Sequence, residues 1–170
     1  MVSFVGALLS GLVALAVTEG ALASAIARQT AQQQYLDDHN TVRAQHGAAP
    51  LTWSSDLATF AQNWANRCQF AHSGGPNGGE YASAHRCTNI AAGTGGFTIG
   101  DAITAWVNEA SSYDPNNPQP SHFTQVVWKS SRQLGCAVAA CNNILPGFNG
   151  ISQFYVCEYS PPGNVIGEFP

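Results

Sequence analysis

The side chains with the chemistry of a functional site are His72, Glu109 and His122, and they are widely spaced along the chain. A neutral imidazole is a good ligand for zinc or copper, and a carboxylate either binds a metal ion or orients a water bound to it. The alternative role for each histidine is structural, as a hydrogen-bonded ring in the wall of a polar cleft. Residue types alone leave both roles open.

Hydrolytic chemistry is the less favoured use of these residues. Ser73 follows His72 directly, but a serine nucleophile needs a base within hydrogen-bond reach and an oxyanion hole, and the G-x-S-x-G motif is absent. A metal-dependent hydrolase would need a further carboxylate as general base. We therefore expect a non-enzymatic protein, with a metal-dependent hydrolase as the weaker alternative.

The elements that must position these side chains follow from the apolar periodicity. Helices are expected over 29–45, from Ser54 to Cys68 and from Thr98 to Val107. His39 and His46 fall in the first helix without partners and are expected at the surface. The Gly-rich stretch 71–96, which includes His85, is expected to be a long loop. Short apolar runs at 123–128, 134–140 and 153–159 are expected as strands, which indicates an α+β domain with an antiparallel sheet.

The first residues predict export. An apolar run from Val5 to Val17 precedes small residues, which is typical of a signal peptide over 1–23, cut after Ala23 or Ala25. The run is shorter than the roughly 20 residues that span a bilayer, so we expect no transmembrane anchor after cleavage. Residues 24–170 are expected to form one secreted domain.

Charge and cysteine usage narrow the partners and the compartment. The six basic residues are scattered and the formal net charge is −4, so nucleic acid is not an expected partner. Five cysteines in an exported chain imply disulfides, and the odd number leaves one cysteine over.

Four motifs follow one another in order over most of the chain: 71–76 after Cys68, Trp106–Glu109, Ser121–Trp128 and Phe154–Asn164. Together they make the sequence similar to the CAP superfamily of cysteine-rich secretory proteins, antigen 5 and plant pathogenesis-related class one proteins, as a fungal or plant-type member. Glu158 stands in the last motif where asparagine is more usual. The resemblance implies a three-layer α-β-α sandwich with a central antiparallel sheet. It also implies the disulfides Cys68–Cys136 and Cys141–Cys157, with Cys87 unpaired.

The resemblance further implies a central cleft in which two histidines and two glutamates converge and can hold a divalent ion. His72, Glu109 and His122 match three of these positions. The fourth falls on Glu80 when counted forward from His72 and on Thr88 when counted back from 90–93, with an insertion between the two registers. We prefer Thr88, which means loss of one carboxylate. No cofactor is then required, and a metal ion such as zinc would have only a weakened site at His72 and His122.

The function that the resemblance implies is binding of sterols or fatty-acid-like lipids outside the cell, in defence or host–pathogen encounters. Phe97, Tyr113 and Phe123 are the aromatic candidates for the wall of an apolar pocket, unless they fill the core. The alternative function is that of an extracellular effector that binds a protein receptor.

Overall fold

The computed structural model describes residues 19–73 and 88–169. The predictions that concern Glu80, His85 and Cys87, and most of the proposed signal peptide, lie outside these ranges. Within them, no helix combines the length and the hydropathy that a membrane span needs.

The described residues form the helices α1 (Glu19–Gln45), α2 (Ser55–Ala65), α3 (Ile99–Asn108) and α4 (His122–Val126) and the short 3-10 helix η2 (Glu109–Ser112). Local side chains fix where they begin. The hydroxyl of Ser54 accepts the N–H of Leu57 at the start of α2. Thr98 and Asp101 form a capping box at the start of α3. The predicted helix starts at Ser54 and Thr98 are therefore confirmed.

The sheet has four strands in the order β1-β3-β4-β2: β1 (Thr52–Trp53), β2 (Thr88–Thr94), β3 (Gln133–Asn142) and β4 (Ile151–Ser160). β3 and β4 pair antiparallel along their whole length, and β2 pairs antiparallel with β4. Only the two-residue β1 is parallel to its neighbour. The sheet is therefore antiparallel except at one edge.

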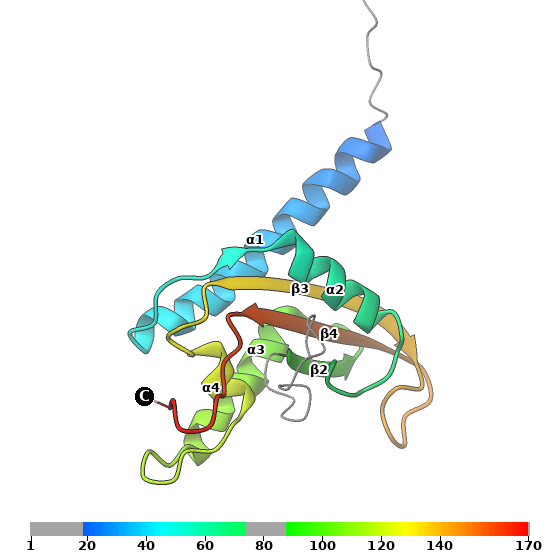
Figure 1. Cartoon of the computed structure of the whole chain (residues 1–170). Helices are drawn as coiled ribbons and strands as arrows, with labels where there is room; N and C mark the ends of the chain where they lie inside the picture. The colour runs from blue at the N-terminus through cyan, green and yellow to red at the C-terminus, as the bar shows by residue number, and fades with distance from the viewer. Residues whose placement is uncertain (1–18, 74–87, 170) are drawn as a thin grey trace, which may run out of the picture.

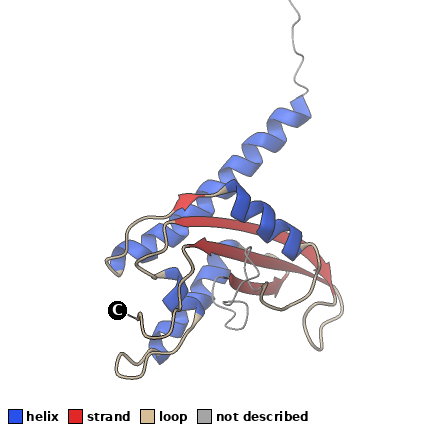
Figure 2. Cartoon of the chain, viewed as in Figure 1, coloured by secondary structure: helices blue, strands red, loops and turns tan. Residues whose placement is uncertain are grey.

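Helices cover both faces of the sheet (Figure 1), and the view coloured by secondary structure shows the strands between them (Figure 2). On one face, α2 packs on Ala137, Phe154 and Val156. On the other, α1 and α3 pack on Leu134 and Tyr159. These two cores make the three-layer α-β-α sandwich that the resemblance implied.

Two secondary-structure predictions were wrong. The run 123–128 was expected as a strand, but its first part forms α4, because Ser121 and Thr124 build a capping box that starts a helix. The end of the predicted loop 71–96 is the strand β2, which pairs with β4 over its whole length. The first outcome follows from a local capping signal, whereas the second depends on a tertiary pairing that overrides local composition.

Both predicted disulfide pairings were also wrong, because the structure joins Cys68 to Cys141 and Cys136 to Cys157. Cys136 lies opposite Cys157 in the β3–β4 register and shares the α1 and α3 face with it. Cys141 lies on the opposite face, which α2 covers and where Cys68 follows that helix. Since side chains alternate between faces along a strand, Cys136 and Cys141 cannot exchange partners.

His39 was expected at the surface and is instead fully buried. Its Nδ1 lies 2.7 Å from the carbonyl oxygen of Tyr35, which only accepts, so Nδ1 carries the proton and Nε2 accepts from the hydroxyl of Tyr159 at 2.8 Å. One turn later, the buried Arg43 donates to the carbonyl oxygens of Ala49, Val126, Trp128 and Ser131. These contacts tie α1 to β4 and to the segment after α4.

Candidate functional site

A cleft of about 430 Å³ opens where loops from both faces of the sheet meet. It contains the three predicted site residues and five others, and is lined by His72, Thr88, Asn89, Glu109, Pro120, Ser121, His122 and Asn164. The segment after α2, the start of β2, the start of η2, the start of α4 and the C-terminal tail each contribute to it. Residues that are far apart in the sequence are therefore brought together as predicted.

Glu109 holds His122 by both carboxylate oxygens. Oε1 accepts a hydrogen bond from Nδ1 of His122 at 2.7 Å, and Oε2 accepts the backbone N–H of the same residue at 2.7 Å. The second contact places a negative charge at the start of α4, where helical N–H groups are unpaired. Because Nδ1 carries the proton, Nε2 keeps the lone pair, and this buried atom has no hydrogen-bond partner among the described residues.

His72 lies against His122 with the two rings stacked, 5.6 Å between centroids and 16° between planes. Its Nδ1 lies 2.9 Å from the carbonyl oxygen of Thr88, so this nitrogen is also the protonated one. Trp106 stacks on His122 from α3, with 6.1 Å between centroids. In His122 the remaining nitrogen, Nε2, is the atom with a lone pair for a ligand.

At the preferred fourth position, Thr88 brings a hydroxyl and no carboxylate. That hydroxyl lies 3.0 Å from both carboxyl oxygens of Glu158 and 2.6 Å from Oγ of Ser73, which is itself 2.6 Å from Oε1 of Glu158. The two hydroxyls have two protons for this ring of contacts, and a proton on Glu158 completes it. Burial favours that protonated form, since it raises the pKa of Glu158 to about 7, while the hydrogen bonds from Ser73 and Thr88 oppose the shift.

The fit of a metal ion to the cleft is incomplete. Among the described residues, the one group with three candidate ligand atoms within 4.8 Å of one another is His39, Cys136 and Cys157. The two cysteines of that group form a disulfide, so they present no thiolate to a metal. His72, Glu109 and His122 do not meet this criterion. The described residues of the cleft therefore bring two imidazole rings together, and further ligands would have to complete the shell of a zinc ion.

A second hollow, of about 350 Å³, lies beside α4. Tyr113 and Phe123 line it together with Val127 and Trp128, and the basic side chains of its lining are His46 and Lys129. The rings of Tyr113 and Phe123 make an edge contact, with 6.3 Å between centroids. Two of the three predicted aromatic residues are thus brought to one hollow.

Phe97, the third predicted aromatic residue, does not line this hollow. Its ring packs edge-on against Tyr155, with 5.9 Å between centroids. A Cβ at Gly93 would lie 2.3 Å from the same ring, which shows how closely the backbone approaches it. Phe97 is therefore a packing residue over β2 and β4.

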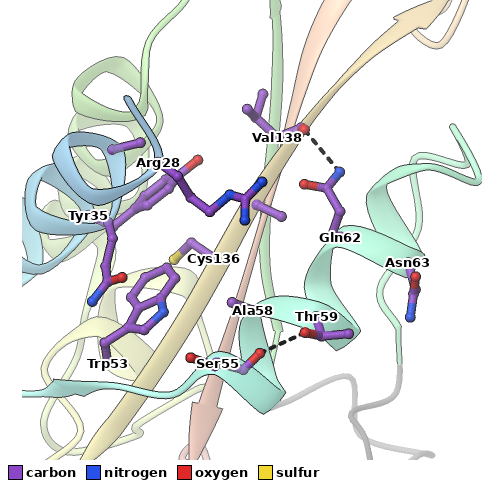
Figure 3. A pocket seen from close by; sticks show the side chains of 13 residues that line it. Arg28, Tyr35, Trp53, Ser55, Ala58, Thr59, Gln62, Asn63, Cys136 and Val138 are labelled. Carbon is purple, nitrogen blue, oxygen red and sulfur yellow. Dashed lines mark hydrogen bonds between the residues drawn. The ribbon is translucent and has the colours of Figure 1, made fainter. Parts of the chain in front are cut away.

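A further groove, of about 530 Å³, lies between α1 and α2 over β3 (Figure 3). Tyr35 and Trp53 stack in its wall with 5.9 Å between centroids. Across the groove, Gln62 of α2 donates to the carbonyl oxygen of Val138 at 3.2 Å. Arg28 also lines it. The sequence analysis did not predict this groove, since it depends on how two helices flank one strand.

Sequence reasoning missed several groups that hold the cleft together. Asn89 donates to the carbonyl oxygen of His122 at 3.0 Å, and Asn164 donates to that of Ser121 at 2.9 Å. Asn164 also accepts from the hydroxyl of Thr124 at 2.6 Å. The pattern S-x-x-T at 121–124 was the available signal, because it is a capping sequence for a helix.

Comparisons with known proteins show the family and the fold of this chain. The model of the cysteine-rich secretory protein (CAP) family matches residues 36–159. Pathogenesis-related protein 1C of Nicotiana tabacum is 42% identical over 153 residues, covering 84% of this chain and 82% of that protein. Pathogenesis-related protein 1 of Arabidopsis thaliana is 39% identical over 167 residues, covering 94% of both. The crystal structure of NaASP2 with Zn²⁺ has a TM-score of 0.60 at 22% identity, covering 79% of this chain and 81% of that one.

Proposed function

Because this chain belongs to the cysteine-rich secretory protein family, with plant pathogenesis-related relatives, we propose that it is a secreted binder of sterols or other small apolar lipids with a role in defence. Its action is non-enzymatic. The signal peptide over 1–23 would direct the domain 24–170 to the outside of the cell.

The hollow beside α4 carries this proposal. Its volume of about 350 Å³ falls within the range of small-molecule sites, roughly 300–1,000 Å³. The aromatic walls from Tyr113, Phe123 and Trp128 suit an apolar skeleton. Lys129 and His46 are exposed in its lining and suit the hydroxyl or carboxylate of an amphiphile.

The test is a binding assay on the purified mature protein with labelled cholesterol, ergosterol and palmitate. Ala110 is half-buried in the lining of the α4 hollow, and Ala58 is half-buried in the lining of the α1–α2 groove. Ala110→Trp should fill the first, and Ala58→Trp should fill the second. Each variant is thus the matched control for the other.

We expect saturable binding of at least one lipid, lost in Ala110→Trp and kept in Ala58→Trp. The reverse pattern would move the ligand to the groove of Figure 3. Absence of saturable binding for all three lipids would contradict the proposed function.

A hydrolase is less well supported by the contacts of Ser73. Its hydroxyl lies against Glu158 and Thr88, and Nδ1 of the neighbouring His72 is engaged by a carbonyl oxygen. A serine nucleophile needs an imidazole base within hydrogen-bond reach. Zinc binding by His72 and His122 remains part of the proposal as a weak, non-catalytic interaction.

The alternative function, an extracellular protein–protein effector, is favoured by one surface feature. Phe148 and Ile151 are exposed at the β3–β4 connection, by 37% and 59%. Large exposed apolar side chains that lie close together are typical of protein interfaces. If the protein is an effector, the Ala110→Trp variant should bind intact cells as well as wild type does. A variant with both Phe148→Ser and Ile151→Ser should lose that binding.

A further inference from the structure

Glu158 is a fully buried acidic side chain next to the cleft, and it does not line the cleft. Its carboxyl group makes hydrogen bonds with two hydroxyl groups, those of Ser73 and Thr88. A buried carboxyl group is costly unless hydrogen bonds compensate for its lost hydration. The position of this carboxyl group in β4 therefore needs an explanation.

The register of the sheet explains why Glu158 meets Thr88. The two residues lie directly opposite each other in the antiparallel β2–β4 pair, so their side chains share one face. In the register preferred from the family resemblance, Thr88 stands where the motif has glutamate, and Glu158 stands where asparagine is more usual. In that register a carboxyl group is missing from one position and present at the position facing it.

Glu158 is also connected to His72 by two routes. Ser73, whose hydroxyl donates to Glu158 at 2.6 Å, follows His72 in the chain. Thr88, whose hydroxyl also contacts Glu158, offers its carbonyl oxygen to Nδ1 of His72 at 2.9 Å. Both contacts restrain the segment that carries the imidazole.

We propose that in this chain the second carboxyl group of the cleft has moved from β2 to β4, and that Glu158 is a positioning residue for His72. It acts through the hydroxyl groups of Ser73 and Thr88, which anchor the segment after α2 to the edge of the sheet. The ring of His72 is thereby held against that of His122. This role concerns the imidazole cleft and is independent of lipid binding in the α4 hollow.

The exchange of side chains between the two strands provides the test. We would compare Glu158→Asn, Thr88→Glu and the double variant Thr88→Glu with Glu158→Asn, using Zn²⁺ alone as the probe in calorimetry. Loss of a group that orients a histidine ligand typically costs about 10–100-fold in metal affinity. Glu158→Asn should lose at least about tenfold, and the double variant should recover it.

A second measurement needs no metal. In wild-type protein, nitrogen chemical shifts of the His72 ring should report a single tautomer with the proton on Nδ1. Glu158→Asn should give a mixture of tautomers, and the double variant should restore one. This readout also applies if wild-type protein binds no Zn²⁺.

The matched control places a glutamate elsewhere on the same strand and face. Thr94 lies opposite Ser152 at the other end of the β2–β4 pair. Thr94→Glu in the Glu158→Asn background should not restore the His72 tautomer. If Glu158→Asn lowers thermal stability but leaves the tautomer and the Zn²⁺ affinity unchanged, Glu158 is only structural and the proposal is wrong. A double variant that fails to recover the tautomer would overturn it equally.

Discussion

The imidazole rings of His72 and His122 stack with 5.6 Å between centroids, and each ring has its Nδ1 proton fixed by a different kind of acceptor. A backbone carbonyl oxygen accepts from His72 and the carboxylate of Glu109 accepts from His122. Both rings are therefore held in one orientation in the wall of the cleft.

Zn²⁺ binding should depend on both rings and should be weak, because two imidazoles and water make a poor zinc shell. His122→Ala and His72→Ala should each reduce the affinity by at least about tenfold. His46→Ala is the control, since His46 is exposed and outside this cleft. Isothermal titration with ZnCl₂ measures the effect, and equal affinity in all variants would exclude the cleft as the zinc site.

His39 should make the protein less stable as the pH falls. Burial lowers the pKa of His39 to about 4, so between about pH 6.5 and 4 the unfolded chain takes up a proton that the folded chain refuses. The free energy of unfolding should lose about 3 kcal/mol across this window. Urea unfolding at pH 7 and pH 5 measures this contribution as a difference between variants: His39→Gln should become more stable from pH 7 to pH 5, whereas wild type and the exposed control His46→Gln should change little because Glu158 opposes His39.

Glu158 should have the opposite effect over nearly the same window. Burial raises the pKa of Glu158 to about 7, so from about pH 4.5 to 7 the unfolded chain releases a proton that the folded chain retains. Stability should fall by about 3 kcal/mol as the pH rises through this range.

Glu158→Gln removes that loss, because the amide does not titrate. In this variant the free energy of unfolding should rise from pH 5 to pH 7, driven by His39, whereas in wild type the two contributions largely cancel. Urea unfolding at the two pH values is the measurement. A wild-type profile as steep as that of Glu158→Gln would contradict the shift at Glu158.

The disulfides predict which thiol each substitution sets free. Cys136→Ser should leave Cys157 as a free thiol, and Cys68→Ser should leave Cys141 as a free thiol. Alkylation of the unfolded protein followed by fragment mass spectrometry identifies the free thiol. In the chain-entropy model, removing the Cys136–Cys157 disulfide costs about 3 kcal/mol. Removing the Cys68–Cys141 disulfide costs about 4 kcal/mol, because it closes a longer loop. Alkylation of Cys136 in the Cys68→Ser protein would support the pairing that the family resemblance implied.

Gly135 should be intolerant of any side chain. A Cβ there would lie 2.2 Å from the backbone nitrogen of Ala58, so α2 would have to move away from β3. Gly135→Ala should lower the free energy of unfolding by about 3 kcal/mol. Gly96→Ala is the matched control, because a Cβ at Gly96 meets nothing within 4 Å, and its effect in denaturant unfolding should be small. Similar losses in the two variants would show that α2 does not pack as closely as described.

Local sequence signals predicted much of the fold. The helix starts at Ser54 and Thr98 are confirmed, since a capping hydroxyl and the apolar residues that follow it act within one or two turns. The run 123–128 was wrongly predicted as a strand, because its β-branched and aromatic residues favour a strand while the capping pair Ser121 and Thr124 favours a helix.

The spacing of Cys136 and Cys141 constrains which faces of the sheet the two disulfides can occupy. Cys136 and Cys141 are an odd number of residues apart, so one strand must point them to opposite faces of the sheet. The pairing implied by the family resemblance did not take these faces into account. Convergence of His72 and His122 does not depend on which pairing holds, because Glu109 and Thr88 fix the rings directly.

The amino-acid sequence by itself determined the family, the sandwich architecture and the identity of the residues His72, Glu109 and His122, because motifs and caps are short-range patterns. Only the tertiary structure decided that His39 is buried and that Glu158 faces Thr88. Both depend on contacts between segments far apart in the chain. Such contacts are set by strand register and by which face each helix covers, and no local pattern encodes either.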